Sequence, residues 1–213
     1  MKRKVRTIQQ PLLPEGLSQI SLSDISNETL VEIGKVTYVD GPIEAEHVRF
    51  EEVHFRNVNL TGSKLPFSSW SNSILEDCDL SHVDFSRTRF HRVLFKNCKL
   101  AGTDFDQTEL RDVYWQECQA PYALFNQTDM RDVCFTNCLL KGANFLDSKW
   151  DYVQFGHSTI DDVQFTGTSL KNVDLSNCQF TTIHTNAEEI KGAIISAEQA
   201  VSFIELFGVK VKD

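Results

Sequence analysis

Every fifth residue from Phe50 to Phe180 is apolar, and this spacing constrains the fold more than any other feature. All 27 positions of the register hold Phe, Leu, Trp, Ile, Met or Ala. Two residues before each of them, from Val48 to Cys178, stands a small side chain: Ala, Ser, Thr, Cys or Val. A period of five fits neither an α-helix, with about 3.6 residues per turn, nor the alternation of a simple strand. The spacing predicts a backbone that turns a corner after every five residues and points both side chains inward.

A second spacing, of 20 residues, indicates that four corners close one coil. Five cysteines share one column of this period, with Ser158 in the single gap: Cys78, Cys98, Cys118, Cys138 and Cys178. Gly62, Gly102 and Gly142 recur at one corner, where a residue that readily adopts φ > 0 is favoured. We expect the coils to stack by hydrogen bonding to their neighbours, with the large and small apolar positions filling the interior.

The N-terminal part of the chain departs from this repeat. Ile20, Ile25 and Leu30 keep the five-residue phase weakly, and residues 31–39 break it. We therefore predict a cap or an imperfect first coil in this region. The basic residues before Pro11 are expected to form a flexible tip.

The C-terminal part carries the signals of a short helix. Ser196 and Gln199 form a capping box, which marks a helix start. An apolar stripe follows at helical spacing: Ala200, Phe203, Ile204 and Phe207. Gly208 suits a C-terminal cap, and residues 209–212 alternate as a short strand does. The chain is thus predicted to divide into an N-terminal region (1–45), the repeat (46–195) and a C-terminal helix and strand (196–213).

The repeat units resemble a known family. Units such as Val83-Asp-Phe85-Ser-Arg87 and Ala143-Asn-Phe145-Leu-Asp147 are similar to the A(D/N)LXX consensus of the pentapeptide repeat family. The resemblance implies an all-β fold, a right-handed quadrilateral β-helix, here with a short C-terminal α-helix. The C-terminal ending is similar to that of the Qnr-type and MfpA-type members, which dimerise through such a helix.

This resemblance makes the C-terminal helix a candidate dimer interface, formed by Ala200, Phe203, Ile204 and Phe207. The helix also carries more apolar surface than one shaft end needs to cover, which favours a homodimer. The alternative is a helix that only plugs the end of its own solenoid.

The composition limits the kinds of partner that the protein can bind and its cellular location. The net charge of −9 disfavours direct binding to nucleic acid or to anionic lipid, because both are negative. No apolar run approaches the length of about 18 residues that a membrane span needs. The N-terminus does not have the long apolar core of a signal peptide, and six cysteines then suggest reduced thiols. These features predict a cytoplasmic protein.

The sequence offers little chemistry. Its six histidines share no metal-ligand spacing, and thiols aligned in one column cannot surround a tetrahedral zinc ion. Stacking leaves a disulfide between Cys78 and Cys98 open as an alternative, disfavoured only by the compartment. Cys134 is out of register, so we expect it to face outward and to be the reactive thiol. No nucleotide-binding or nucleophile motif is present, and we predict no cofactor, no metal and no enzymatic activity.

Two functional hypotheses remain. The first is a protein-interaction rod for an unidentified cytoplasmic partner. The second, implied by the Qnr resemblance, is a DNA mimic that binds DNA gyrase or topoisomerase IV and modulates their activity or quinolone sensitivity. The candidate acidic surface for the second consists of Asp79, Asp84, Asp104, Asp129 and Asp174. Against it, residues 46–185 hold 19 acidic and 13 basic side chains, and the loop insertions of several Qnr proteins are missing.

Overall fold

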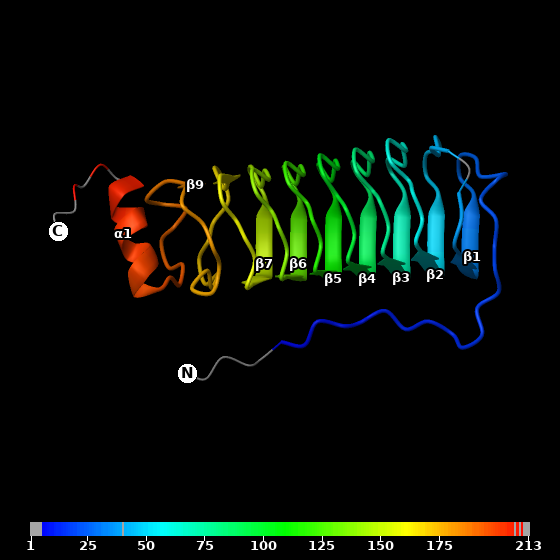
Figure 1. Cartoon of the computed structure of the whole chain (residues 1–213), viewed down its shortest axis with the longest axis horizontal. Helices are drawn as coiled ribbons and strands as arrows, with labels where there is room; N and C mark the ends of the chain where they lie inside the picture. Colours follow the sequence, from blue (N-terminus) through cyan, green and yellow to red (C-terminus); the bar gives the residue numbers. More distant parts are fainter. Residues whose placement is uncertain (1–5, 40, 207, 209, 211–213) are drawn as a thin grey trace.

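A computed structural model describes residues 6–39, 41–206, 208 and 210 of the chain. One parallel sheet of seven strands runs in sequence order along a rod (Figure 1). Its strands are β1 (Leu30–Val36), β2 (Arg49–Arg56), β3 (Ser69–Glu76), β4 (Arg89–Lys96), β5 (Glu109–Gln116), β6 (Asp129–Thr136) and β7 (Lys149–Gly156). A second sheet pairs β8 (Val163–Gln164) with β9 (Ile183–His184), and α1 (Ala197–Leu206) closes the C-terminal end.

Neighbouring strands from β2 to β7 pair at the coil period that the sequence predicted, with Arg49 opposite Ser69 and Arg89 opposite Glu109. The remaining sides of each coil are joined by isolated parallel bridges with the same period, including Asp84 with Asp104. Four consecutive pentapeptides therefore make one coil. The fold is a right-handed, four-sided β-solenoid of about eight turns.

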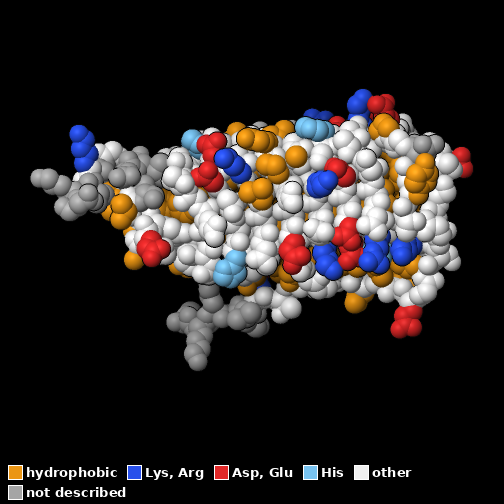
Figure 2. All heavy atoms as spheres, viewed as in Figure 1, with side chains coloured by type: hydrophobic (Ala, Val, Ile, Leu, Met, Phe, Trp, Pro, Cys, Tyr) orange, Lys and Arg blue, Asp and Glu red, His pale blue; other side chains and the backbone are white. Residues whose placement is uncertain are grey.

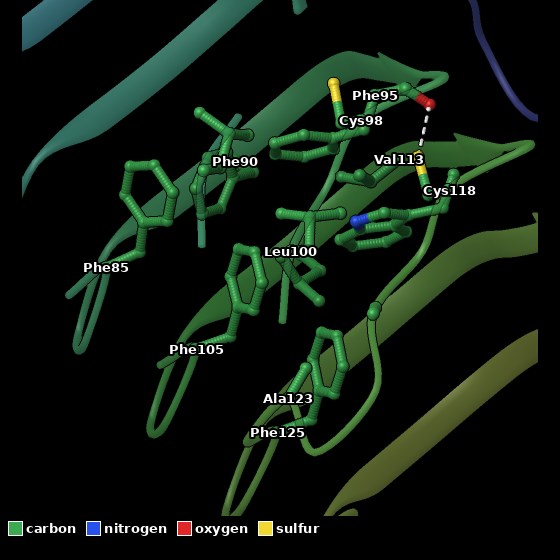
Figure 3. Close-up of a cluster of buried hydrophobic side chains, with 14 of the residues drawn as sticks. Phe85, Phe90, Phe95, Cys98, Leu100, Phe105, Val113, Cys118, Ala123 and Phe125 are labelled. Carbon is green, nitrogen blue, oxygen red and sulfur yellow. Dashed lines mark hydrogen bonds between the residues drawn. The ribbon is translucent and has the colours of Figure 1, made fainter. Parts of the chain in front are cut away.

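The interior holds the residues of the five-residue register. Of the 27 large positions, 25 are buried, while Trp150 and Phe180 near the C-terminal end are partly buried against the core. Aromatic rings in successive coils form a stack (Figure 3), in which the centroid of Phe125 lies 4.9 Å from that of Phe105 and 4.7 Å from that of Phe145. This confirms the predicted core.

All 27 small positions are buried too, and hydrogen bonding explains why many of them are Ser, Thr or Cys. Many of their hydroxyl or thiol groups donate to a backbone carbonyl 23 residues earlier, in the preceding coil, and others, such as Ser68 and Thr108, donate to a carbonyl three residues earlier. Thr103 Oγ1 reaches the Leu80 carbonyl at 2.8 Å, and Cys118 Sγ reaches that of Phe95 at 3.4 Å (Figure 3). These bonds satisfy the hydroxyl and thiol groups that they join inside the core, where an unpaired polar group would be costly.

Each corner depends on one left-handed residue. At every fifth position from His47 to Asn172 the backbone has φ > 0, and only four of these positions hold glycine. At Gly142 a Cβ would also come within 2.7 Å of the Tyr122 ring in the preceding coil, so glycine leaves room for the ring in its present position. The corner glycines thus have the role that the sequence predicted for them.

The first coil differs from its expected phase. β1 pairs with β2 in a register shorter by one position than that of the later strands, so that Val31 and not Leu30 lies opposite Phe50. Val31 and Val36 are buried, whereas Leu30 is 40% exposed. The prediction for Leu30 is therefore wrong, because a coil one residue short moves the inward position by one. Ile20 and Ile25 pack against the core as expected.

The C-terminal helix begins with the predicted capping box. The Gln199 amide donates to Ser196 Oγ at 3.2 Å, and the Ser196 amide donates to Gln199 Oε1 at 2.9 Å. Gln199 Nε2 also donates to the carbonyls of Leu175 and Cys178 at 2.8 and 2.9 Å, which ties the helix to the last coil. Gly208 has φ of 77°, as a helix C-cap requires. The strand expected at 209–212 lies almost wholly outside the described residues.

Candidate interaction surfaces

One face of the rod, which we call the strapped face, carries a column of apolar side chains that point outward. Its outward residues in β3 to β6 are Ile74, Leu94, Tyr114 and Cys134. Residues 6–17, the N-terminal strap, run back alongside the strands from β1 toward β7 (Figure 1). The strap crosses this column, because its polar contacts reach β5, β6 and β7.

Arg6 anchors the far end of the strap. Its guanidinium lies 2.8 Å from an Asp151 carboxylate oxygen and 3.6 Å from one of Asp132. The same group sits over the Tyr152 ring, 5.7 Å from the centroid, and the Tyr152 hydroxyl donates to the Arg6 carbonyl at 3.4 Å. At this end of the strap, Arg6 is therefore held by two carboxylates, by an aromatic ring and by a hydrogen bond to its backbone carbonyl.

Two further contacts hold the strap backbone. The Gln9 amide donates to Asp112 Oδ1 at 2.8 Å, and the Tyr114 hydroxyl donates to the Ile8 carbonyl at 3.3 Å. Between these anchors the Ile8 side chain is only 5% exposed. The predicted flexible tip is therefore wrong for residues 6–10, while residues 1–5 lie outside the described part of the chain.

The strap also corrects the prediction for Cys134. This residue points away from the core, as expected, but it is only 8% exposed, and the strap, which contacts β5, β6 and β7, runs over this part of the face. Burial raises the pKa of Cys134, and it likewise raises the pKa of Tyr114. A buried thiol with a raised pKa is a poor nucleophile, so Cys134 is not the reactive site that its register suggested.

The inward cysteine column is confirmed. All of its members are buried free thiols, and burial raises the pKa of Cys178 to about 12. The pKa of Cys118 is raised well above its ordinary value for the same reason. Among the described residues, no three His, Cys, Asp or Glu side chains gather as a metal site would require.

Beyond Arg6 the strapped face opens into a groove of about 680 Å³. It is lined by residues of β6, β7 and the coils that follow, including Cys134, Trp150, Gln154, Lys171 and Asp174. The groove continues the line of the strap, because Arg6 and Asp151 also belong to its wall. Sequence reasoning missed both the groove and the strap. The signal that was available is the apolar outward column, since outward positions of a solenoid are normally polar.

The five candidate acidic residues do not form one surface. Asp79, the Asp84–Asp104 pair, Asp129 and Asp174 lie on four different faces, and only Asp84 and Asp104 are adjacent. Four of the carboxylates accept the backbone amide two residues ahead, with distances of 2.8 Å for Asp84 and Asp104 and 2.9 Å for Asp174. Their evident role is to cap corners. Burial raises the pKa of Asp104.

Charges on neighbouring coils compensate one another. Lys96 lies 2.9 Å from Glu76, Lys64 2.9 Å from Glu44, and Arg131 3.6 Å from Asp151, and each pair joins equivalent positions of adjacent coils. Asp129 is also paired across coils, with Arg111 at 2.8 Å. Figure 2 shows basic and acidic side chains interspersed on the visible face, without a continuous acidic surface.

The candidate dimer residues lie in different surroundings, some against the core and some at the surface. Phe203 is 4% exposed and packs edge-on against Phe180, with centroids 5.5 Å apart, so it seals the shaft. Ala200 is half-buried, and Phe207 lies outside the described residues. Ile204 is 42% exposed, as is the neighbouring Val201 at 45%. A dimer through this helix stays a prediction, and Ile204 and Val201 are the apolar side chains that the described surface offers for it.

No described helix has both the length and the apolar character needed to cross a membrane.

Comparison with proteins of curated description gives no match. Among solved structures, the chain aligns with HetL, a pentapeptide repeat protein involved in heterocyst differentiation regulation in the cyanobacterium Nostoc. The identity is 17% and the TM-score 0.44, over 79% of this chain and 90% of HetL. It also aligns with full-length QnrB1, a plasmid-mediated fluoroquinolone resistance protein, at 14% identity and a TM-score of 0.31, over 84% of this chain and 100% of QnrB1.

Family models match the repeat directly. The "Pentapeptide repeat region" model matches residues 88–165 and 125–195, and the "Pentapeptide repeats (8 copies)" model matches residues 54–92. Together these matches cover more than half of the 213 residues, and they coincide with the coils described above. The chain therefore belongs to the pentapeptide repeat family.

Proposed function

We propose that this protein is a non-catalytic interaction rod that binds a cytoplasmic protein partner through its strapped face. The observation that carries the proposal is the apolar outward column of β3 to β6 together with the groove that continues it. Apolar side chains that point outward are typical of binding sites, and here the chain itself covers part of the column, whose members are partly or fully buried. Pentapeptide repeat proteins are in general non-enzymatic rods, which agrees with this role.

The filled interior supports the non-catalytic part of the proposal. Catalysis usually needs a concave site in which several reactive groups converge with perturbed pKa values. Here the strongly perturbed thiols are packed in the core behind the coil walls, out of reach of a substrate. The groove on the strapped face is open and brings together aromatic, amide and carboxylate groups, a composition that suits recognition of a peptide.

Matched substitutions on two faces test the proposal. Gln154 lies exposed on the strapped face at the groove, and Gln119 lies exposed on a different face. Partners would be captured from host lysate with the wild-type protein, purified, and measured by calorimetry against Gln154→Arg and Gln119→Arg. We expect at least about a tenfold loss of affinity for Gln154→Arg, a change of about 1.4 kcal/mol, and none for Gln119→Arg. Equal affinities of both variants would contradict the proposed face.

The second candidate function, DNA mimicry toward a type II topoisomerase, is favoured by the rod shape and the net charge of −9. Duplex DNA presents like charges along its whole length, whereas this rod alternates opposite charges between coils. An assay of DNA supercoiling by gyrase separates the two functions. The interaction rod proposed here leaves supercoiling unchanged at high protein excess, and inhibition would favour the mimic.

We further propose a homodimer through α1, with Val201 and Ile204 at its centre. Both side chains are exposed on a helix whose other apolar face already seals the shaft through Phe203. Exposed aliphatic side chains at the end of a solenoid favour self-association, because the exposed ends of stacked repeats are otherwise prone to aggregate.

A further inference from the structure

We propose that the strapped face is a groove for an extended peptide that carries an arginine two residues before an aliphatic side chain. The N-terminal strap, through Arg6 and Ile8, would then be a built-in mimic of the partner's segment. This inference rests on the proposed function, which it deepens by naming the chemistry of the partner. It is carried by the contacts that the strap makes and by the part of the groove that the strap leaves open.

The arginine has a defined receptor. Asp132 and Asp151 lie on adjacent coils and both face the Arg6 guanidinium, while the Tyr152 ring lies beneath it. A planar guanidinium can engage two carboxylates and an aromatic face at once, and a lysine ammonium matches this arrangement less well. Arginine is therefore the favoured residue at this position.

The other polar contacts between the strapped face and the strap are made only to backbone atoms of the strap. Asp112 accepts an amide, and the hydroxyls of Tyr114 and Tyr152 donate to carbonyls. Any extended chain presents amides and carbonyls in the same directions, so these contacts do not select a sequence. Selectivity comes from the arginine and from the aliphatic side chain two residues later, which in the strap is the buried Ile8.

The strap is held weakly enough to be exchanged. Within residues 6–10 only Ile8 is buried, and the other side chains are exposed. Exposed ion pairs such as Arg6 with Asp151 add little to affinity, so these contacts favour arginine over other residues without fixing the strap in place. A partner segment that makes the same contacts, and more besides, can therefore displace the strap.

Additional contacts are available in the open part of the groove. A partner chain that continues on the N-terminal side of its arginine enters the 680 Å³ space beside Trp150 and Gln154. Asp174 and Lys171 line the same space, so a short polar or singly basic stretch is accommodated there. The partner thus gains contacts that strap residues 6–17 do not make.

The test uses a fluorescent peptide with the sequence of residues 6–13, Arg-Thr-Ile-Gln-Gln-Pro-Leu-Leu, and the full-length protein. Ile8→Asp removes the buried anchor and opens the groove, while Leu12→Asp is the matched control in the strap, because Leu12 is 74% exposed. We expect Ile8→Asp to bind the peptide at least about tenfold more tightly than the wild type and Leu12→Asp do, as measured by fluorescence anisotropy. A peptide with its Arg and Ile replaced by Glu and Asp should not bind.

Adding Asp132→Asn and Asp151→Asn to Ile8→Asp should remove the preference for arginine over glutamate in the peptide. Arg6→Glu provides a second way to open the groove, and circular dichroism checks that each variant is folded. Equal peptide binding by the wild type, Leu12→Asp and both opened variants would overturn the inference. If the captured partner is sensitive to Gln154→Arg but opened protein ignores the Arg-x-Ile peptide, the inference fails while the proposed function stands.

Discussion

Replacing Phe125 by alanine probes the core at its most ordered point. The Phe125 ring is fully buried and lies nearly parallel to the rings of Phe105 and Phe145, at interplanar angles of 2° and 3°. The rings of Trp115 and Phe135 meet it edge-on at 5.9 and 5.8 Å. The substitution therefore removes contacts on four sides and leaves a cavity between three coils.

The expected cost is in the upper part of the usual range of about 3–5 kcal/mol for Phe→Ala. The range depends on how far the walls collapse into the cavity, and here they are fixed. Backbone hydrogen bonds hold the coils at their spacing, as the 2.7 Å bond from the Phe125 amide to the Asn144 carbonyl shows. We therefore expect a loss of about 4–5 kcal/mol in the free energy of unfolding, measured by guanidinium denaturation.

Gln119→Ala in the same coil is the control, because its side chain is exposed and should cost less than about 0.5 kcal/mol. The stack adds a coupling test: Phe105→Ala and Phe125→Ala should be non-additive, because the two rings are in contact. Phe85→Ala and Phe165→Ala, four coils apart and without a shared neighbouring ring, should add. A loss below about 1 kcal/mol for Phe125→Ala would refute the reasoning, because it would mean that the ring is not inside a rigid shaft.

Three further predictions concern the C-terminal helix and one carboxyl group. Val201→Asp with Ile204→Asp should convert a dimer to a monomer in light scattering without unfolding it, and an unchanged mass would contradict the proposed interface. Ser196→Ala should cost the helix about 1 kcal/mol through loss of the cap, seen as faster amide exchange in α1; unchanged exchange would contradict it. Burial raises the pKa of Asp104, so the folded state binds the extra proton and stability falls as pH rises from about 4 through the raised pKa. Asp104→Asn keeps the acceptor for the Asp106 amide and should flatten this pH dependence of the melting temperature without destabilising the protein at pH 7.

Most of the solenoid could be predicted because its information is periodic. The inward register from Phe50 to Phe180 and the cysteine column depend only on the two regular spacings that the sequence displays directly. The capping box at Ser196 is local and was equally visible. Such features are decided by residues that are near each other in sequence, or by a repeat that brings equivalent positions together.

The features that the sequence did not reveal are non-periodic. The one-residue shift of β1 comes from the length of the first coil, and no single residue marks it. The strap joins Arg6 to Asp151, 145 positions away, so no local pattern could predict the contact. Cys134 was correctly predicted to lie on the outside of the coil and wrongly predicted to be exposed to solvent. Its burial could not be predicted, because the strap that runs over this part of the face belongs to the N-terminal end of the chain.

The candidate acidic surface shows a different limit of the sequence. Asp79, Asp104 and Asp174 look equivalent as acidic neighbours of core residues, yet the coil places them on separate faces. Their carboxylates bond to nearby backbone amides, and a cation on the next coil balances Asp79. Counting acidic residues therefore overestimates how negative any one face of the rod is.

Thiol titration is the most direct test of the central claim, that the strapped face is a binding surface covered by the protein's own N-terminal segment. All six thiols are buried, so the native wild-type protein should show none that reacts rapidly with Ellman's reagent. Ile8→Asp should expose one rapidly reacting thiol per chain, and it should disappear with Cys134→Ser. One fast thiol in the wild-type protein, at the rate seen in Ile8→Asp, would contradict the account.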